Sequence, residues 1–496
     1  MTKINKNLQI EVNARANNDN IIEGKGYRIT LITPRLVRVE SQRENKFLDQ
    51  ATLCFWNRDL GKVEHEVNKI GNVLEIKTEK AVFYFNERSK RITKVNLEGK
   101  IIPCTNRGNL LGTARTLDMN FGYKKLQNGI ISKKGVSIVD DSGSLIFTGS
   151  EVKARSIKQK DMYIFAYGKD YRQAVKDFYK IAEQVPLLPR FALGNWWSRY
   201  KAYTQQEYMD LMTRFENEDI PFTVATVDMD WHWVDINNKF GCNFRKPQPF
   251  QPAGWTGYSW NTDLFPDRQF FLDWLHSHNY IITLNLHPAQ GVRYFEDMYE
   301  TMATKMGIDP TTKQTVKFDI TDPNFINNYF EILHHPYEKE GVDFWWMDWQ
   351  QGKKSAIKGL DPLWSLNHYH FLDNAKDGKR PMLLSRYSGL GAHRYPVGFS
   401  GDTVANWCSL KFQPYFTANA ANAGYGWWSH DIGGHTFGVK DDELYLRWCQ
   451  FGVFSPINRL HSTSHDLQGK EPWFCRDEVK NIVSDFLRLR HKMLPY

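Results

Sequence analysis

The sequence predicts an α/β protein in which a (β/α)₈ barrel follows an antiparallel β-sandwich. Two observations predict this fold class. From Phe191 onward, short apolar runs alternate with amphipathic, helix-like runs, as in parallel βα units. Up to about Tyr167, apolar and polar residues instead alternate with period two, as in half-buried strands. At 496 residues the chain is also long enough for two or three domains.

The N-terminal third shows the strand pattern most clearly at residues 26–40 and 73–86. Residues 92–103 carry an NLEG turn between two apolar runs and predict a hairpin. A helical pattern at 170–184 then leads into VPLLPR, whose two prolines make a stiff linker. We therefore expect a sandwich domain at 1–167, a helix and linker at 168–190 and a barrel at 191–496.

Eight strands are expected in the barrel, and eight βα units fit a closed barrel of about 250 residues. They begin at Phe191, Phe222, Tyr280, Val342, Pro381, Tyr395, Gly426 and Phe454. An open doubly wound sheet is the alternative. Such a sheet typically carries a Gly-rich dinucleotide-binding loop after an early strand, and the segment SGLGAHR lacks the third Gly of that loop. Residues 232–264, which contain Trp233, Trp255 and Trp260, predict a folded insertion over a site.

Composition argues against several classes of protein. The net charge of +8 comes from dispersed basic residues, so we expect no nucleic-acid partner. The six cysteines form no CxxC pair or disulfide-framework spacing. No run of about 18 apolar residues is present to span a membrane, and the first residues lack the apolar run of a signal peptide. We expect a soluble, cytoplasmic protein.

Polar residues follow nearly every predicted barrel strand, where barrel enzymes place their chemistry. They are Arg199, Asp228, Asp230, Asn285, His287, Asp348, Arg386, Asp402, His430, Asp431 and His461. Stability alone does not explain so many. Carboxylates, arginines and histidines hydrogen-bond hydroxyl groups, and the 17 tryptophans supply flat apolar faces. This combination suits a polyhydroxylated ring.

Breaking a glycosidic bond requires two carboxyl groups in different protonation states. Asp348 and Asp402 end different strands on the same rim, so they could face each other across a bound sugar. A gap of about 5–5.5 Å would indicate a retaining mechanism, and about 6.5–9.5 Å an inverting one.

The segments WWMDWQQG, SRYS, SGDT, HDIGGH and FSPINRLHS, in this order, resemble glycoside hydrolase family 31, which contains retaining α-glucosidases, α-xylosidases and transglycosylases. The resemblance extends from about Gly26 to the C-terminus. It implies that Asp348 is the catalytic nucleophile and Asp402 the general acid/base. It also implies substrate contacts for Arg386, His461, Asp228, Asp230 and Asp431, with Trp346 and Phe399 as apolar walls.

The resemblance sets expectations for the two acids. Asp348 should stay ionised because Arg386 and backbone donors stabilise its charge. Asp402, nearer the mouth, should keep its proton. Two departures concern linkage and leaving-group preference: Gln351 stands where many family α-glucosidases have Glu, and His435 where an aromatic residue is common. The chain also ends at RHKMLPY, where family members usually continue into C-terminal β domains.

We therefore predict a retaining α-glycosidase, an α-glucosidase acting on short α-linked oligosaccharides without metal or cofactor. The expected partner is the oligosaccharide, and a homo-oligomer is left open. An α-xylosidase and an α-glucosyl transferase are alternatives within the family. A catalytically silent carbohydrate-binding protein and a metal-dependent hydrolase are alternatives from other classes. His368 and His370 form a possible metal pair, but in a helix such residues point apart, which favours a surface or packing role.

Overall fold

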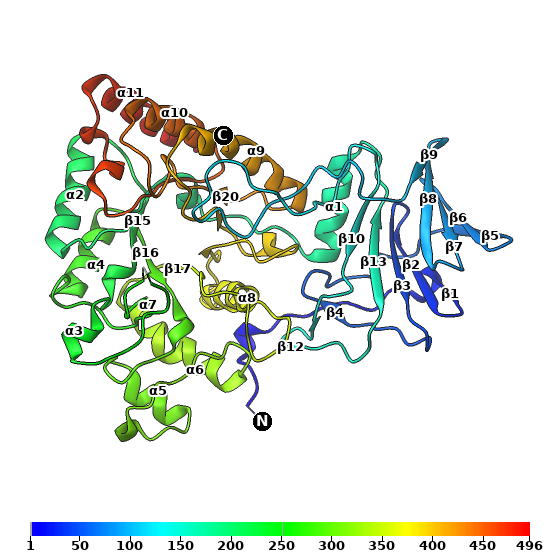
Figure 1. Cartoon of the computed structure of the whole chain (residues 1–496), viewed down its shortest axis with the longest axis horizontal. Coiled ribbons are helices and arrows are strands. Elements are labelled where there is room, and N and C mark those ends of the chain that lie inside the picture. The colour runs from blue at the N-terminus through cyan, green and yellow to red at the C-terminus, as the bar shows by residue number, and fades with distance from the viewer. Residues whose placement is uncertain (1, 250) are drawn as a thin grey trace.

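The computed structural model describes residues 2–249 and 251–496, so Met1 and Phe250, the latter inside the predicted insertion, lie outside the described residues. The molecule has two parts: strands of the N-terminal region on the right of Figure 1 and the barrel on the left. An antiparallel sandwich and a parallel eight-stranded barrel confirm the predicted fold class. The predicted domain limits remain our proposal for how the chain divides.

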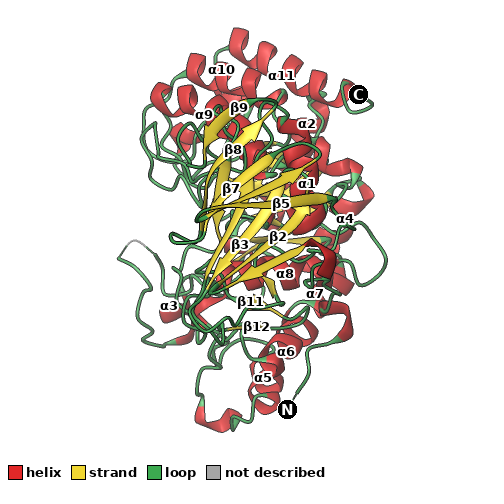
Figure 2. Ribbon diagram, turned by 90° about the vertical axis from the view of Figure 1, so that its right-hand side faces the viewer, coloured by secondary structure: helices red, strands yellow, loops and turns green. Residues whose placement is uncertain are grey.

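Two five-stranded antiparallel sheets form the sandwich, whose strands face the viewer in Figure 2. The first has the order β1 (Ile21–Gly24), β2 (Tyr27–Thr33), β3 (Leu36–Ser41), β13 (Lys160–Phe165) and β10 (Ser137–Asp140). The second runs β5 (His65–Ile70), β6 (Val73–Thr78), β7 (Val82–Asn86), β8 (Arg91–Leu97) and β9 (Lys100–Pro103). A small sheet consists of β12 (Val152–Lys153), β11 (Ile146–Phe147) and β4 (Ala51–Thr52).

Period-two alternation explains the core between the two sheets. Ile29 and Val39 of the first sheet pack in one cluster with Phe83 and Phe85 of the second, because alternate residues of a strand point to the same face. The predicted hairpin is confirmed: β8 pairs with β9 across Glu98–Gly99, both with positive φ, as in the tight turns that match strand twist.

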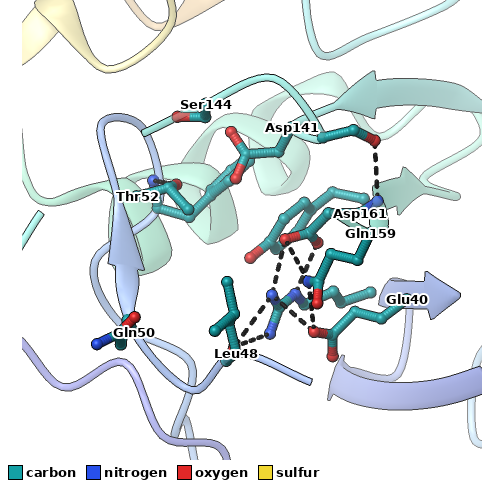
Figure 3. Close-up of polar contacts among 12 residues, drawn as sticks. Glu40, Leu48, Gln50, Thr52, Asp141, Ser144, Gln159 and Asp161 are labelled. Atoms are coloured by element: carbon teal, nitrogen blue, oxygen red, sulfur yellow. Dashed lines mark hydrogen bonds and ion pairs between the residues drawn. The ribbon is translucent and has the colours of Figure 1, made fainter. Parts of the chain in front are cut away.

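A buried charge network ties β3 to β13 in the sandwich (Figure 3). Arg38 donates to both oxygens of Asp161 at 2.8 and 2.7 Å and lies 3.0 Å from Glu40. Gln159 donates to Glu40 at 3.0 Å, and Arg28 forms a second ion pair with Glu40 at 2.7 Å. Buried charges are stable only when paired in this way, so the network fixes how these strands sit.

Helix α1 (Tyr171–Ala182) covers the other face of the first sheet. Its first turn is capped by Asp170, which accepts from Gln173 N. Phe178 and Ile181 pack against Tyr163 of β13. The helix thus fills the space between the sandwich and the chain that enters the barrel.

The barrel consists of eight parallel strands in the order β20, β19, β18, β17, β16, β15, β14, β21. They are β14 (Asn195–Trp197), β15 (Val224–Val227), β16 (Ile281–Leu286), β17 (Phe344–Met347), β18 (Leu384–Ser385), β19 (Gly398–Phe399), β20 (Trp428–Ser429) and β21 (Asn458–Leu460). A parallel bridge between Ile432 and Leu460 joins the two ends of the ring. All eight predicted strands are confirmed, but the first begins at Asn195 and the last at Asn458, each four residues later than predicted. Residues 190–193 form a 3₁₀ turn instead.

Helices surround the barrel, with α9, α10 and α11 along its upper edge in Figure 1. They are α2 (Gln205–Asn217), α3 (Ile236–Phe240), α4 (Arg268–Ser277), α5 (Tyr299–Lys305), α6 (Pro323–Leu333), α7 (His335–Glu340), α8 (Pro362–Asn374), α9 (Trp407–Ala420), α10 (Asp442–Val453) and α11 (Asp477–Lys492). None of the described helices combines the length and apolarity needed to cross a membrane. His368 and His370 are buried in α8, so a packing role replaces the surface alternative.

Two stretches of the N-terminal region lie against the barrel instead of the sandwich. Ile4 and Leu8 belong to the barrel's core cluster. Leu117 and Leu126, in the long connection between β9 and β10, pack against Phe416 of α9. This second stretch brings sandwich-domain sequence to the carboxyl ends of the barrel strands.

Candidate active site

The predicted rim residues Asp348 and Arg386 form a direct ion pair. Asp348 follows β17 and Arg386 follows β18, and these strands are neighbours. Arg386 Nε and Nη2 both donate to Asp348 Oδ1, at 2.8 and 2.7 Å. The other carboxylate oxygen, Oδ2, lies 3.3 Å from His287 Nε2. Among the described residues the hydrogen-bond donors to Asp348 are therefore side-chain groups, which corrects our expectation of backbone donors.

Asp402 approaches the same guanidinium group. Its Oδ1 lies 3.9 Å from Arg386 Nη2, the atom that also contacts Asp348. The separation of the two carboxylate oxygens is at most the sum of these two distances. For these two Oδ1 atoms the upper bound lies near the lower end of the carboxyl spacing of about 6.5–9.5 Å in inverting enzymes. The Asp348 side chain is 8% exposed and the Asp402 side chain 23%, so Asp402 lies nearer the mouth of the site, as expected.

A third carboxylate comes from the N-terminal region and was not predicted. Asp118 lies between β9 and β10, and its Oδ1 accepts from Arg386 Nη1 at 2.6 Å and from the backbone N–H of Asp402 at 2.9 Å. Thr116 accepts a further hydrogen bond from Arg386 Nη1. Gly401 makes this approach possible, because a Cβ there would lie 2.2 Å from Asp118 Oδ1 and 2.3 Å from Arg386 Nη1.

The pKa values of the two predicted catalytic acids move in opposite directions. Burial opposes ionisation of Asp348, but the positive charge of Arg386 and the contact with His287 outweigh it and hold the pKa of Asp348 below its usual value. Burial and the negative charges of Asp118 and Asp348 raise the pKa of Asp402 well above its usual value, against the opposing charge of Arg386. The surroundings thus favour the ionised form of Asp348 and the protonated form of Asp402.

Asp431 pairs with a second buried arginine. Arg459 of β21 donates to Asp431 Oδ1, while Asp431 Oδ2 has no protein partner within the described chain. Burial, opposed by the charge of Arg459, raises the pKa of Asp431 to about 7. Trp346 and Phe399, expected as apolar walls, are almost completely buried, and Arg459 lies over both rings at 4.9 and 5.0 Å. Each ring therefore packs against the guanidinium group of Arg459 and does not line an open cavity.

The remaining predicted contacts lie at β15 and β21. Asp228 accepts from the N–H of Met229 at 2.7 Å, and its Oδ2 is 3.9 Å from His461 Nε2. Burial raises the pKa of Asp228 well above its usual value and that of Asp230 to about 6. Asp230 is buried on the same turn, with no ion pair to the other site residues in the described chain. Arg199 is turned away and pairs with Glu471 at 2.7 Å.

Several buried polar atoms around these acids have no hydrogen-bond partner among the residues that the structure describes. They are both side-chain polar atoms of Asn285, Nδ1 of His287, both ring nitrogens of His430, Nδ1 of His435, and Oδ2 of Asp431. Buried polar groups in proteins are nearly always satisfied. A cluster of free donors and acceptors at the strand ends is therefore a place where ligand hydroxyl groups can bind.

Two groups of residues have the composition of a metal site. Asp431, His435 and His461 have ligand atoms within 4.8 Å of one another, as do His335, Glu338 and Asp373. In each group a basic side chain already forms an ion pair with the acids: Arg459 contacts Asp431, and Lys376 contacts Glu338 and Asp373. A divalent ion would have to displace or repel that cation, so neither arrangement favours metal binding.

Residues 185–496, more than half of the chain, match the family model described as the glycosyl hydrolases family 31 TIM-barrel domain. The chain belongs to glycoside hydrolase family 31. Within family 31, it is 24% identical over 401 residues to an α-xylosidase of Saccharolobus solfataricus and 23% identical over 372 residues to α-glucosidase 2 of Bacillus thermoamyloliquefaciens. These matches cover 74% and 68% of this chain, but only 50% and 44% of the two relatives, so the chain spans about half their length.

Two solved family 31 structures have the same fold. A family 31 α-xylosidase from a soil metagenome, in complex with xylose, aligns with a TM-score of 0.71 at 18% identity over 96% of this chain and 83% of its own. A Flavobacterium johnsoniae family 31 dextranase in complex with isomaltotriose aligns with a TM-score of 0.72 at 17% identity over 95% of this chain and 66% of its own.

Contacts to Asp402 involve the stretch where this chain departs from the family 31 pattern. Gln350, two residues after Asp348, donates from Nε2 to Asp402 Oδ2 at 3.0 Å. His435 Nε2 lies 3.9 Å from Asp402 Oδ1. Burial lowers the pKa of His435 to about 3, so its ring is neutral near pH 7. Gln350, the neighbour of the departure Gln351, and the departure His435 thus both approach one carboxyl group.

Proposed function

We propose that this chain carries the catalytic site of a retaining α-glycoside hydrolase, with Asp348 as nucleophile and Asp402 as general acid/base. The single observation that carries this proposal is that one guanidinium group contacts two carboxyl groups whose pKa values are shifted in opposite directions. Such a divergence assigns an acid and a base within one site.

In the first step Asp348 attacks the anomeric carbon. Oδ1 of Asp348 is held by two N–H groups of Arg386, which leaves Oδ2 as the attacking atom. A bond forms between Oδ2 and the anomeric carbon, and the bond from that carbon to the leaving oxygen breaks. Asp402 gives its proton to this oxygen, so the leaving sugar departs as a neutral alcohol.

In the second step Asp402, now ionised, takes a proton from the incoming water. The water oxygen bonds to the anomeric carbon and the ester to Asp348 breaks, which returns both acids to their starting states. A sugar hydroxyl in place of water gives transglycosylation. Gln350 is a positioning residue in this scheme, because its amide fixes Asp402 Oδ2 and leaves Oδ1 to carry the proton.

Arg386 acts mainly on the charge of Asp348. It donates hydrogen bonds to Asp348, Asp118 and Thr116, so four of its five N–H groups are already used by the protein. We assign hydroxyl binding to groups with free capacity, which are Asp431 Oδ2, His287 Nδ1 and the pair formed by Asp228 and His461.

We propose short α-linked gluco-oligosaccharides as substrates, hydrolysed by an α-glucosidase activity. An α-xylosidase is the second candidate, because relatives named α-xylosidase are found both by sequence and by structure.

The six cysteines are unpaired in the structure, which supports a reducing, cytoplasmic location.

A product screen followed by proton NMR tests the proposal. The substrates are α-linked glucose disaccharides of each linkage and an aryl α-xyloside. We expect the α-anomer to appear first in the product, because two inversions at one carbon restore the configuration. Initial release of the β-anomer, or no hydrolysis of any α-glycoside, would contradict the assignment.

A further inference from the structure

Three adjacent chain segments surround the acid/base Asp402. The segment 402–405 lies between residues 117–122 and residues 434–438. On one side Met119 N donates to Asp402 O at 2.9 Å and Val404 N to Asn120 O at 3.2 Å. On the other side Ala405 N donates to Thr436 O at 2.9 Å. The two flanking segments carry Asp118 and His435, which approach Asp402 from either side, so their neighbouring residues lie beside the acid/base.

Large apolar side chains project from these segments into solvent. We call them the apolar rim: Met119, Phe121, Trp407, Phe437 and Val439, which are between 46% and 76% exposed. Met119 and Phe121 lie on one flanking segment and Phe437 on the other, while Val439 and Trp407 follow just beyond the second flanking segment and the central one. A group of exposed apolar residues of this kind marks an interaction site.

Side-chain and backbone contacts hold the apolar rim in place. Trp407 Nε1 donates to Asp441 at 2.9 Å, which fixes the edge of the indole ring and leaves a face exposed. Met119 and Phe437 have φ angles of 57° and 52°, a left-handed conformation that non-Gly residues rarely adopt. Such backbone persists where the surroundings impose it and is common at ligand sites. Gln468 contributes here by donating to Phe437 O at 2.7 Å.

We propose that the apolar rim binds the leaving-group side of an α-linked glucan chain, the sugar units beyond the scissile bond. This inference rests on the proposed function, because it takes Asp402 as the group that protonates the leaving oxygen. Sugars present C–H faces that pack on aromatic rings. A protein partner seated on the apolar rim would instead block the mouth, where Asp402 and Asp118 are 23% and 27% exposed. The preferred substrate is then a chain longer than a disaccharide.

The test compares kcat/KM for an aryl α-glucoside, a disaccharide and a heptasaccharide of the preferred linkage. In the wild type we expect kcat/KM to rise with chain length. In Phe121→Ala, Phe437→Ala and Trp407→Ala, the ratio of the heptasaccharide value to the aryl glucoside value should fall about tenfold, the loss expected for an aromatic contact. Trp407→Phe should recover part of the ratio because it restores an aromatic face.

Ile70→Ala is the matched control, since Ile70 is 67% exposed on strand β5 of the sandwich, away from the barrel, and it should leave the ratio unchanged. Thermal melting checks that each variant folds. A wild type that hydrolyses all three substrates with no gain from length, or variants that lower all three values equally, would overturn the apolar rim proposal and leave the catalytic one standing. Inactivity of the wild type on every α-glycoside would instead remove the proposed function.

Discussion

A buried charge cluster in the sandwich and another in the barrel differ in how their members are paired. In the sandwich, Arg38, Arg28, Glu40 and Asp161 satisfy one another at 2.7 to 3.1 Å. In the barrel, Arg386 serves Asp348, Asp118 and Asp402 together. Asp431 Oδ2 and His287 Nδ1 have no hydrogen-bond partner in the described part of the chain.

The difference separates a structural cluster from a functional one. A buried ion network stabilises a fold only when its members are satisfied, and loss of one partner is expensive. A cluster with surplus acids and free donors is costly in the unbound protein, and a ligand's hydroxyl groups can complete it. Burial of charge alone therefore does not mark the site; the barrel cluster is distinguished by three acids that share one guanidinium group.

The largest expected effects come from removing the acids of the barrel cluster. Asp348→Asn and Asp402→Asn should each lower kcat by about four orders of magnitude or more on unactivated substrates, with no loss of folded structure by circular dichroism. A glycosyl fluoride separates the two roles, because a good leaving group needs no proton. It should restore the first step in Asp402→Asn but not in Asp348→Asn. Equal behaviour of the two variants would refute the division of roles.

In the sandwich cluster the same kind of change should affect stability alone. Arg38→Met leaves Asp161 and Glu40 buried without their shared cation, which we expect to cost about 3–5 kcal/mol of unfolding free energy in urea. Because the sandwich cluster is remote from the acids, kcat/KM of the folded fraction should not change. A decrease in kcat/KM larger than about twofold in this variant would contradict a purely structural role for the sandwich cluster.

The pH dependence of kcat/KM tests the protonation states in the barrel. Activity requires protonated Asp402, so its raised pKa sets the alkaline limb, and activity falls as pH rises through that value. The Gln350 amide stabilises ionised Asp402. Gln350→Ala should therefore raise the pKa and move the alkaline limb up by about one pH unit. Gln350→Glu adds a negative charge and should move it further. A limb that stays fixed in both variants would show that another group controls it.

The smallest effects compare two glycines with positive φ. A Cβ at Gly401 would contact Asp118 and Arg386, whereas one at Gly99 in the β8–β9 turn would meet nothing within 4 Å. Both Gly401→Ala and Gly99→Ala should cost about 1–2 kcal/mol from the backbone alone. Only Gly401→Ala should also lower kcat/KM, because it displaces the Asp118–Arg386 contact. Comparable activity in the two variants would mean that this contact is dispensable.

Most of the fold was predictable because local sequence patterns indicate its strands and helices. The eight barrel strands follow from apolar runs and the sandwich from period-two alternation, and both were confirmed. The first strand was placed four residues early because Phe191 and Leu193 are apolar although they lie in a 3₁₀ turn.

The pairing of side chains across the site was not predictable. Asp118 is 268 residues from Arg386 along the chain, and its local sequence shows no periodicity. The length of the connection between β9 and β10 was the available signal, since long irregular segments are often functional. Trp346 and Phe399 were chosen by type, but only packing shows that their faces lie under Arg459.

A covalent bond between the sugar and Asp348 is the central feature of the proposed mechanism. A fluorinated glucosyl or xylosyl fluoride, whose glycosyl–enzyme ester hydrolyses slowly, traps this species for peptide mass spectrometry. We expect one glycosyl group on the peptide that contains Asp348, and none when Asp348→Asn is treated in the same way. A label on another residue, or full turnover of the reagent by Asp348→Asn, would contradict the account.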